Sequence, residues 1–109
     1  MSLTKDELRK IGSAMIVAGS YIKDNLTEVR TYDDQVYRYN ATYRIMLLTL
    51  IGNDFYNGLT IDDILDKYSL DGLGLGLEFG AIMTNLLDCA SVVADEETQQ
   101  LIACWEGVF

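Results

Sequence analysis

Apolar residues recur at three- and four-residue steps through most of this chain, which is the spacing of one face of an α-helix. The first such segment begins after Thr4 and Glu7, a capping-box pair, and should end near residues 24–25. Gly12 and Gly19 lie beside its apolar stripe, and we expect them to let a neighbouring helix approach closely. The stripe itself consists of Leu8, Ile11, Met15, Ala18 and Ile22.

The segment that follows, residues 36–51, supports two interpretations. The alternation of Tyr37, Tyr39, Ala41 and Tyr43 with polar residues is typical of a strand. The longer pattern fits a helix, with apolar positions at Val36, Tyr39, Tyr43, Met46, Leu47 and Leu50. Gly52-Asn53 offers a C-cap for that helix. We therefore favour a helix, and a short β-hairpin within residues 27–44 is the alternative.

Three further helices are predicted in the second half of the chain. Asn57-Gly58 marks a turn, and Thr60 with Asp63 is a capping pair that opens a short helix. After a break at residues 69–76, a long apolar stripe predicts a central helix, and Asp95 caps a last one. That stripe consists of Leu75, Phe79, Ile82, Met83, Leu86, Ala90 and Val93. Residues 1–109 are thus predicted to form one small all-α bundle of about five helices.

Composition supports an ordered, water-soluble domain. Half of the 109 residues are apolar, and the chain has no proline. The most apolar run, residues 45–51, is far shorter than the ~20 residues of a membrane-spanning helix. The first residues are too acidic for a signal peptide. We therefore expect a cytoplasmic protein that does not bind the membrane.

Charge is distributed unevenly along the chain. Of the net charge of −9, residues 1–44 contribute +1 from seven bases and six acids, and residues 45–109 contribute −10 from one base and eleven acids. Helix capping explains where about half of these later acids stand. It does not explain why Lys67 is the only base after Arg44. Such asymmetry suggests a surface that attracts a positively charged partner.

Residue types argue against catalysis and against a bound metal or cofactor. The chain has no histidine, which removes the commonest general base and metal ligand. The glycine-rich residues 72–77 lack the Lys-Ser/Thr of a phosphate-binding loop, and a calcium loop in this region would begin at Lys67, which cannot bind calcium. Cys89 and Cys104 are expected to be buried free thiols. We predict no enzyme activity, no metal site and no cofactor.

Two groups of residues are candidates for binding a protein partner. Asp62 and Asp66 are four residues apart, so they project from one face of the short helix. Tyrosines interleaved with arginines around Arg38 are typical of protein interfaces. The candidate partner-binding residues are Asp62, Asp63, Asp66, Asp71, Glu78, Tyr37, Arg38 and Tyr39.

The leading hypothesis is a non-enzymatic binding protein whose acidic surface docks a basic protein. Nucleic-acid-binding proteins carry such basic surfaces, and carboxylates can stand where phosphates would lie. Small acidic phage antagonists, such as anti-CRISPR proteins, act in this way, and the comparison is one of type only. The negative charge argues against direct nucleic-acid binding. The alternative is a self-assembling structural or regulatory homodimer that uses Gly12, Gly19, exposed aromatic residues and the apolar C-terminal Val108-Phe109.

Overall fold

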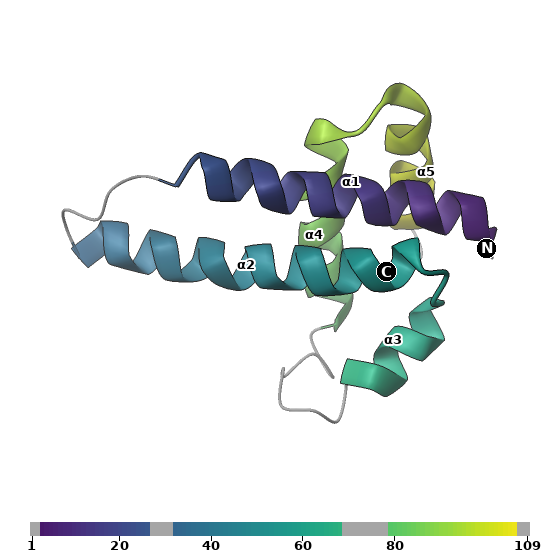
Figure 1. The fold of residues 1–109 in the computed structure, drawn as a ribbon, viewed down its shortest axis with the longest axis horizontal. Helices are drawn as coiled ribbons and strands as arrows, with labels where there is room; N and C mark the ends of the chain where they lie inside the picture. The colour runs from purple at the N-terminus through teal and green to yellow at the C-terminus, as the bar shows by residue number, and fades with distance from the viewer. Residues whose placement is uncertain (1–2, 27–31, 69–78, 107–109) are drawn as a thin grey trace.

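The computed structural model describes residues 3–26, 32–68 and 79–106, and these ranges contain five helices and no strand (Figure 1). The helices are α1 (Lys5–Asp24), α2 (Tyr32–Tyr56), α3 (Ile61–Tyr68), α4 (Phe79–Val93) and α5 (Glu96–Glu106). The all-α prediction is confirmed. The alternative hairpin is not found, because residues 32–44 are helical, while residues 27–31 lie outside the described ranges.

Side-chain caps begin three of the helices at the predicted places. Thr4 donates its backbone N–H to Glu7 Oε1 at 2.9 Å and accepts from the Glu7 N–H at 3.2 Å. Thr60 donates its N–H to Asp63 Oδ2 at 2.9 Å and accepts from the Asp63 N–H at 3.3 Å. Asp95 Oδ1 accepts from the Thr98 N–H at 2.8 Å. Each cap satisfies N–H groups that a helix leaves unpaired in its first turn.

The end of α2 differs from the prediction. Gly52-Asn53 does not cap this helix, which continues to Tyr56. The chain reverses instead at Gly58, whose φ of +87° is the left-handed conformation that glycine adopts without strain. The Asn57-Gly58 turn is thus confirmed, and Gly52 has a different use inside the helix.

That use is close packing between α1 and α2, which lie antiparallel and side by side (Figure 1). A Cβ atom on Gly12 would collide with the carbonyl oxygen of Gly52 and lie 2.6 Å from the backbone nitrogen of Tyr56. A Cβ on Gly52 would lie 2.9 Å from Met15 Cβ. Gly19 is less constrained, at 3.4 Å from Leu48 Cβ.

The predicted close approach at Gly12 is therefore confirmed, but it occurs within one chain. Gly12 and Gly19 are both buried between α1 and α2. The homodimer alternative placed these two glycines between copies of the chain, and in that detail it is wrong. Val108 and Phe109, which it also used, lie outside the described residues.

The core lies where α4 crosses the α1–α2 pair and α5 packs on α1 and α4. Phe55 of α2 and Trp105 of α5 meet edge to face, with ring centroids 5.1 Å apart. Helix α3 is joined to this body by the fully buried Ile64 and by an ion pair between Lys67 Nζ and Asp54 Oδ1 at 2.8 Å. The other fully buried large side chains are Ile11, Met15, Leu47, Leu48, Ile51, Met83, Leu86, Leu87 and Ile102. Among the described helices, none has the length and apolar character that a membrane crossing requires.

Substitution of the two α1 glycines should change stability by different amounts. We expect Gly12→Ala to lower the free energy of unfolding by about 1–3 kcal/mol, because its methyl group meets backbone atoms that cannot rotate away. Gly19→Ala should change it by less than about 1 kcal/mol, because the new contact is ordinary and alanine favours the helix. Urea denaturation followed by helical circular dichroism measures both values. Equal stability of the two variants would contradict the close crossing.

Candidate functional site

The predicted acidic residues of α3 are exposed, and one of them is engaged locally. Hydrogen bonds from the backbone N–H and the hydroxyl of Thr60 lower the pKa of Asp63. Asp62 and Asp66 take part in no hydrogen bond or ion pair within the described part of the chain. Two carboxylates of α3 therefore remain available to a partner. Asp71 and Glu78 lie outside the described residues.

Two members of the predicted tyrosine–arginine group, Tyr37 and Tyr39, do not share one face of α2. Tyr37 and Tyr39 are 55% and 74% exposed, but two helix positions separate them by about 200°, so they point to different sides of α2. They also lie in the half of α2 remote from α3, roughly 25 Å of helix from its end at Tyr56. Arg38 lies between them on α2, and its side chain is outside the described part. The tyrosines and the α3 aspartates are thus not brought together.

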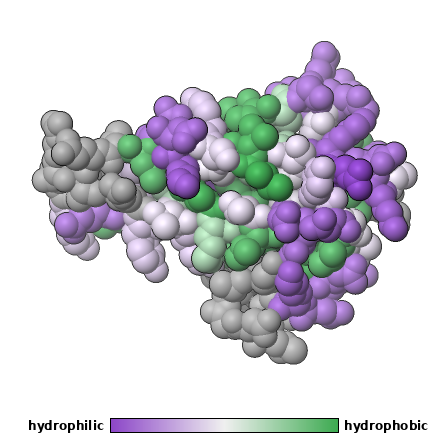
Figure 2. All heavy atoms as spheres, in the orientation of Figure 1, coloured by the Kyte–Doolittle hydropathy of each residue, from purple (hydrophilic) through white to green (hydrophobic). Residues whose placement is uncertain are grey.

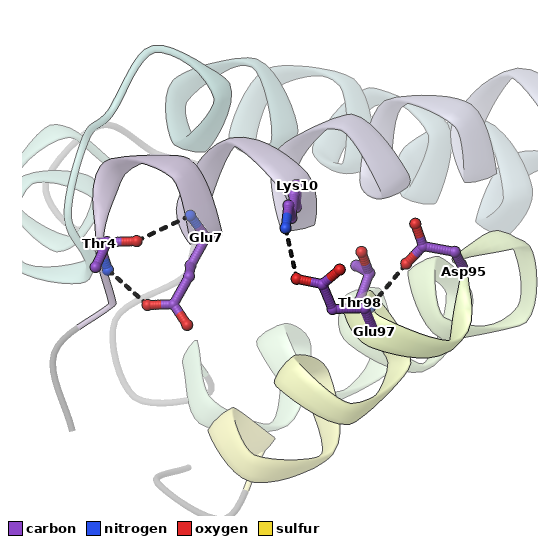
Figure 3. A network of polar contacts seen from close by, with 6 residues as sticks. All are labelled: Thr4, Glu7, Lys10, Asp95, Glu97 and Thr98. Carbon is purple, nitrogen blue, oxygen red and sulfur yellow. Dashed lines mark hydrogen bonds and ion pairs between the residues drawn. The ribbon is translucent and has the colours of Figure 1, made fainter.

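The other acids beyond Arg44 are divided between local contacts and open surface. Asp54 pairs with Lys67, Asp95 caps α5, and Glu97 Oε1 accepts from Lys10 Nζ at 2.6 Å (Figure 3). Asp88 on α4 and Glu96 on α5 have no partner within the described ranges. Figure 1 places α3 and the start of α5 on opposite sides of the α1–α2 pair. The described acids therefore occupy separate parts of the surface.

Between α1 and α5, these contacts form a small polar network. Lys10 of α1 reaches across to Glu97, and this hydrogen bond raises the pKa of Lys10 (Figure 3). Hydrogen bonds from the N–H and the hydroxyl of Thr98 lower the pKa of Asp95. The Lys10–Glu97 pair links α1 to the first turn of α5, and Asp95 caps α5, so these charges already have partners within the fold.

A second apolar face runs along α2 and is exposed to solvent. Its exposed fractions run from 77% at Tyr32 and 74% at Tyr39 down to 36% at Met46. Its members, which we name the α2 seam, are Tyr32, Val36, Tyr39, Tyr43, Met46 and Leu50. They are spaced by four, three, four, three and four residues, the alternation with which a helix packs along another helix.

The α2 seam is distinct from the face that α2 gives to its own core. At 100° per residue, the buried Leu48, Phe55 and Ile51 lie about 160°, 140° and 100° around the helix from the middle of the seam, and the buried Leu47 lies beside it. Helix α2 is therefore apolar on two faces, and within the described ranges α1 and the core cover one of them. A surface helix of a self-sufficient domain needs one apolar face, so the seam is surplus to folding.

A cavity of about 320 Å³ between α2 and α4 borders the seam. Tyr43 belongs to both, so the seam and the cavity are continuous. The other side chains around it include Arg44 and Leu47 of α2 with Ile82, Asn85 and Leu86 of α4. A partner lying along the seam could insert a side chain here.

The larger groove, of about 530 Å³, runs between α1 and the turn that joins α4 to α5. Figure 2 shows hydrophobic residues gathered where the end of α4 lies beside α1, with hydrophilic residues around them. Val17 and Val93 supply apolar lining, and the Arg9 guanidinium lies over the Tyr56 ring at 5.2 Å. Asp6 and Asp95 also line the groove, so both signs of charge meet and no single ligand class is selected.

Neither cysteine is in a disulfide. Cys89 is half-buried, and burial raises the pKa of its thiol, which disfavours the reactive thiolate. Cys104 is exposed, so the prediction that both thiols are buried is wrong for Cys104. The buried residues of α5 in the described part are Thr98, Ile102 and Trp105, and Cys104 is not among them. In the described ranges, no three histidine, cysteine, aspartate or glutamate side chains are placed to hold a metal ion.

The apolar pattern of residues 36–51 predicts a helix but does not show which of its faces is exposed. Five of the six seam residues belong to the helical stripe of the sequence analysis, and a stripe of this kind is equally compatible with a buried face. The informative feature is a second apolar set, Ala41, Leu48, Ile51 and Phe55, which already supplies the buried face. Comparison of the chain with protein-family models, curated protein sequences and solved structures gave no match.

The Asp95 cap predicts a dependence of stability on pH. Because the pKa of Asp95 is lowered in the folded state, its contribution is complete above the ordinary aspartate pKa near 4 and is lost as the pH falls through the lowered value. We expect Asp95→Ala to be less stable than the native chain at pH 7, and the difference to shrink in acid. Urea denaturation at several pH values measures this. Asp62→Ala is the control, and a loss at Asp95 that is independent of pH would contradict the assignment.

Proposed function

We propose that this chain is a non-enzymatic protein-binding domain that docks its partner on the α2 seam. The observation that carries the proposal is the row of six apolar side chains, each at least 36% exposed, on the side of α2 that faces away from α1. Soluble proteins rarely leave so continuous an apolar row in water unless it is a contact surface.

The residue types of the seam also favour a protein partner. Tyr32, Tyr39 and Tyr43 combine a large apolar ring with a hydroxyl that tolerates water, so they suit a surface that is alternately free and covered. Met46 adds a flexible apolar side chain at the other end of the row. The neighbouring cavity offers a place for an anchoring side chain of the partner.

Photo-cross-linking in cells tests the docking surface. A photoreactive phenylalanine analogue replaces Tyr39 on the seam or, as the matched control, Tyr21 of α1, which is 58% exposed. We expect a defined protein adduct from position 39 and none from position 21, because only the seam is in contact with a partner. Adducts of equal yield at both positions, or none at position 39, would reject the seam.

A second candidate is the basic partner that the charge asymmetry suggests. Asp62 and Asp66 are exposed, lie four residues apart on α3 and are not engaged within the described ranges. Exposed carboxylates on one helix face increase the rate at which a protein with a positive surface associates. A nucleic-acid-binding protein that this chain inhibits is one partner of that chemistry.

A pull-down with paired charge variants tests this second candidate. We expect Asp62→Asn with Asp66→Asn to reduce capture of a basic protein several-fold at low salt, because it removes the free carboxylates of α3. Asp88→Asn with Glu96→Gln is the control, because it raises the net charge by the same two units elsewhere on the surface. Equal losses in the two variants would show a general charge effect and would remove α3 as a binding site.

A further inference from the structure

We infer that the occupant of the α2 seam is the same seam of a second copy of this chain, packed antiparallel about a two-fold axis. The inference rests on the proposed docking role of the seam and adds the identity of the partner. Pairing of one patch with itself is the usual form of a homodimer interface. Three features of α2 carry the inference: the register of the seam, its mainly uncharged borders and its area.

The spacing of the seam fits itself in one antiparallel register. In this register the two-fold axis passes beside residue 41, so that the numbers of two opposed residues sum to 82. Tyr39 then lies opposite Tyr43 of the other copy, Val36 opposite Met46, and Tyr32 opposite Leu50. Each pair occurs twice across the axis, so all six seam residues find an apolar counterpart. No seam residue is left opposite a charged one, which a partner of unrelated sequence would not guarantee.

Along its length the seam is bordered mainly by uncharged residues, and the one charged neighbour that the described part of the chain places near its middle, Arg44 at the cavity, is a base. One edge of the seam is lined by Gln35, Thr42 and Thr49, and the other edge by Asn40 and Leu47. Asp33 stands at one end, and Asp54 at the other is buried and paired with Lys67. A chain of net charge −9 can therefore meet its own copy here without opposing acids along the contact. A basic partner would find no row of carboxylates beside this seam.

The exposed area matches what a modest dimer needs. The three seam tyrosines alone expose roughly 400 Å², taking about 150–250 Å² for each whole aromatic side chain. Both copies lose this surface on pairing, and the aliphatic and border residues add to it over a contact about 27 Å long. The total reaches the lower end of specific interfaces, at about 1,200 Å².

Charge and shape favour the antiparallel direction over the parallel one. The amino-terminal half of α2 extends past α4 and α5, while α3 adjoins the carboxyl-terminal end (Figure 1). Antiparallel pairing keeps the two α3 helices, with Asp62 and Asp66, at opposite ends of the dimer. Parallel pairing would place them together and add like-charge repulsion. The two helix dipoles also favour the antiparallel arrangement.

Analytical ultracentrifugation of the purified chain tests the dimer. We expect the mass to rise with concentration from 12.2 kDa toward twice that value, with the midpoint in the micromolar range for an interface of this size. Tyr39→Glu should stay monomeric because it places a charge at the centre of the seam, and Tyr21→Glu should dimerise like the native chain. A native chain that is still monomeric at roughly 0.5 mM, or equal behaviour of the two variants, would overturn the inference.

Disulfide trapping tests the direction and does not depend on the folding of a charged variant. In a background with Cys89→Ala and Cys104→Ser, chains carrying Tyr39→Cys or Tyr43→Cys are oxidised separately and as a mixture. Antiparallel pairing predicts a disulfide-linked dimer in the mixture and little in either chain alone, because position 39 lies opposite position 43. A linked dimer from Tyr39→Cys alone would show the parallel arrangement and refute the inference.

The failure of this inference is distinguishable from the failure of the proposed function. If the purified chain is monomeric while the adduct at position 39 in cells contains a different protein, the seam binds a partner but not its own copy. If position 39 gives no adduct and the chain is monomeric, both proposals fail. An adduct of two copies of the chain, reproduced with the purified protein, supports both.

Discussion

The structure depends on the contact between two glycines, Gly12 of α1 and Gly52 of α2. At this crossing the backbones touch, so the side chains on either side can interdigitate at short range. The position and tilt of α2 follow from it, and so does the sector of α2 that faces α1. Because that sector is fixed, the opposite sector is left uncovered by the other described helices. The exposed seam is thus a geometric consequence of the packing that holds the two longest helices together.

Much of the fold was predictable because its determinants are local. Thr4 with Glu7, Thr60 with Asp63, and Asp95 each begin a helix through bonds that reach only three residues along the chain. The stripe of α1 repeats often enough to identify its buried side. The end of α2 was not predictable in the same way, because Gly52 is a good C-cap by local rules and is kept inside the helix by α1, which is distant in sequence.

The candidate site was predictable only in part, for the same reason. The sequence indicated that Tyr39 and the α3 aspartates are candidate contact residues, and they are exposed. It did not place them relative to one another, because adjacency in space depends on how the helices pack. Asp62 and Tyr39 stand at different ends of the molecule. Tyr37 and Tyr39, neighbours in sequence, are separated by helix geometry itself. The seam is identified as exposed only from the structure, which shows that Leu48, Ile51 and Phe55 form the buried face of α2.

The ion pair between Lys67 and Asp54 has a consequence beyond holding α3 in place. Lys67 is the only base after Arg44, and a largely buried carboxylate engages it. The carboxyl-terminal part of the surface therefore presents negative charge with no mobile cation to offset it. Nucleic acids and many proteins are also anionic, so electrostatic repulsion keeps chance encounters with them brief. A molecule protected in this way can carry an uncovered apolar row without precipitating, and only a surface shaped to that row will remain on it.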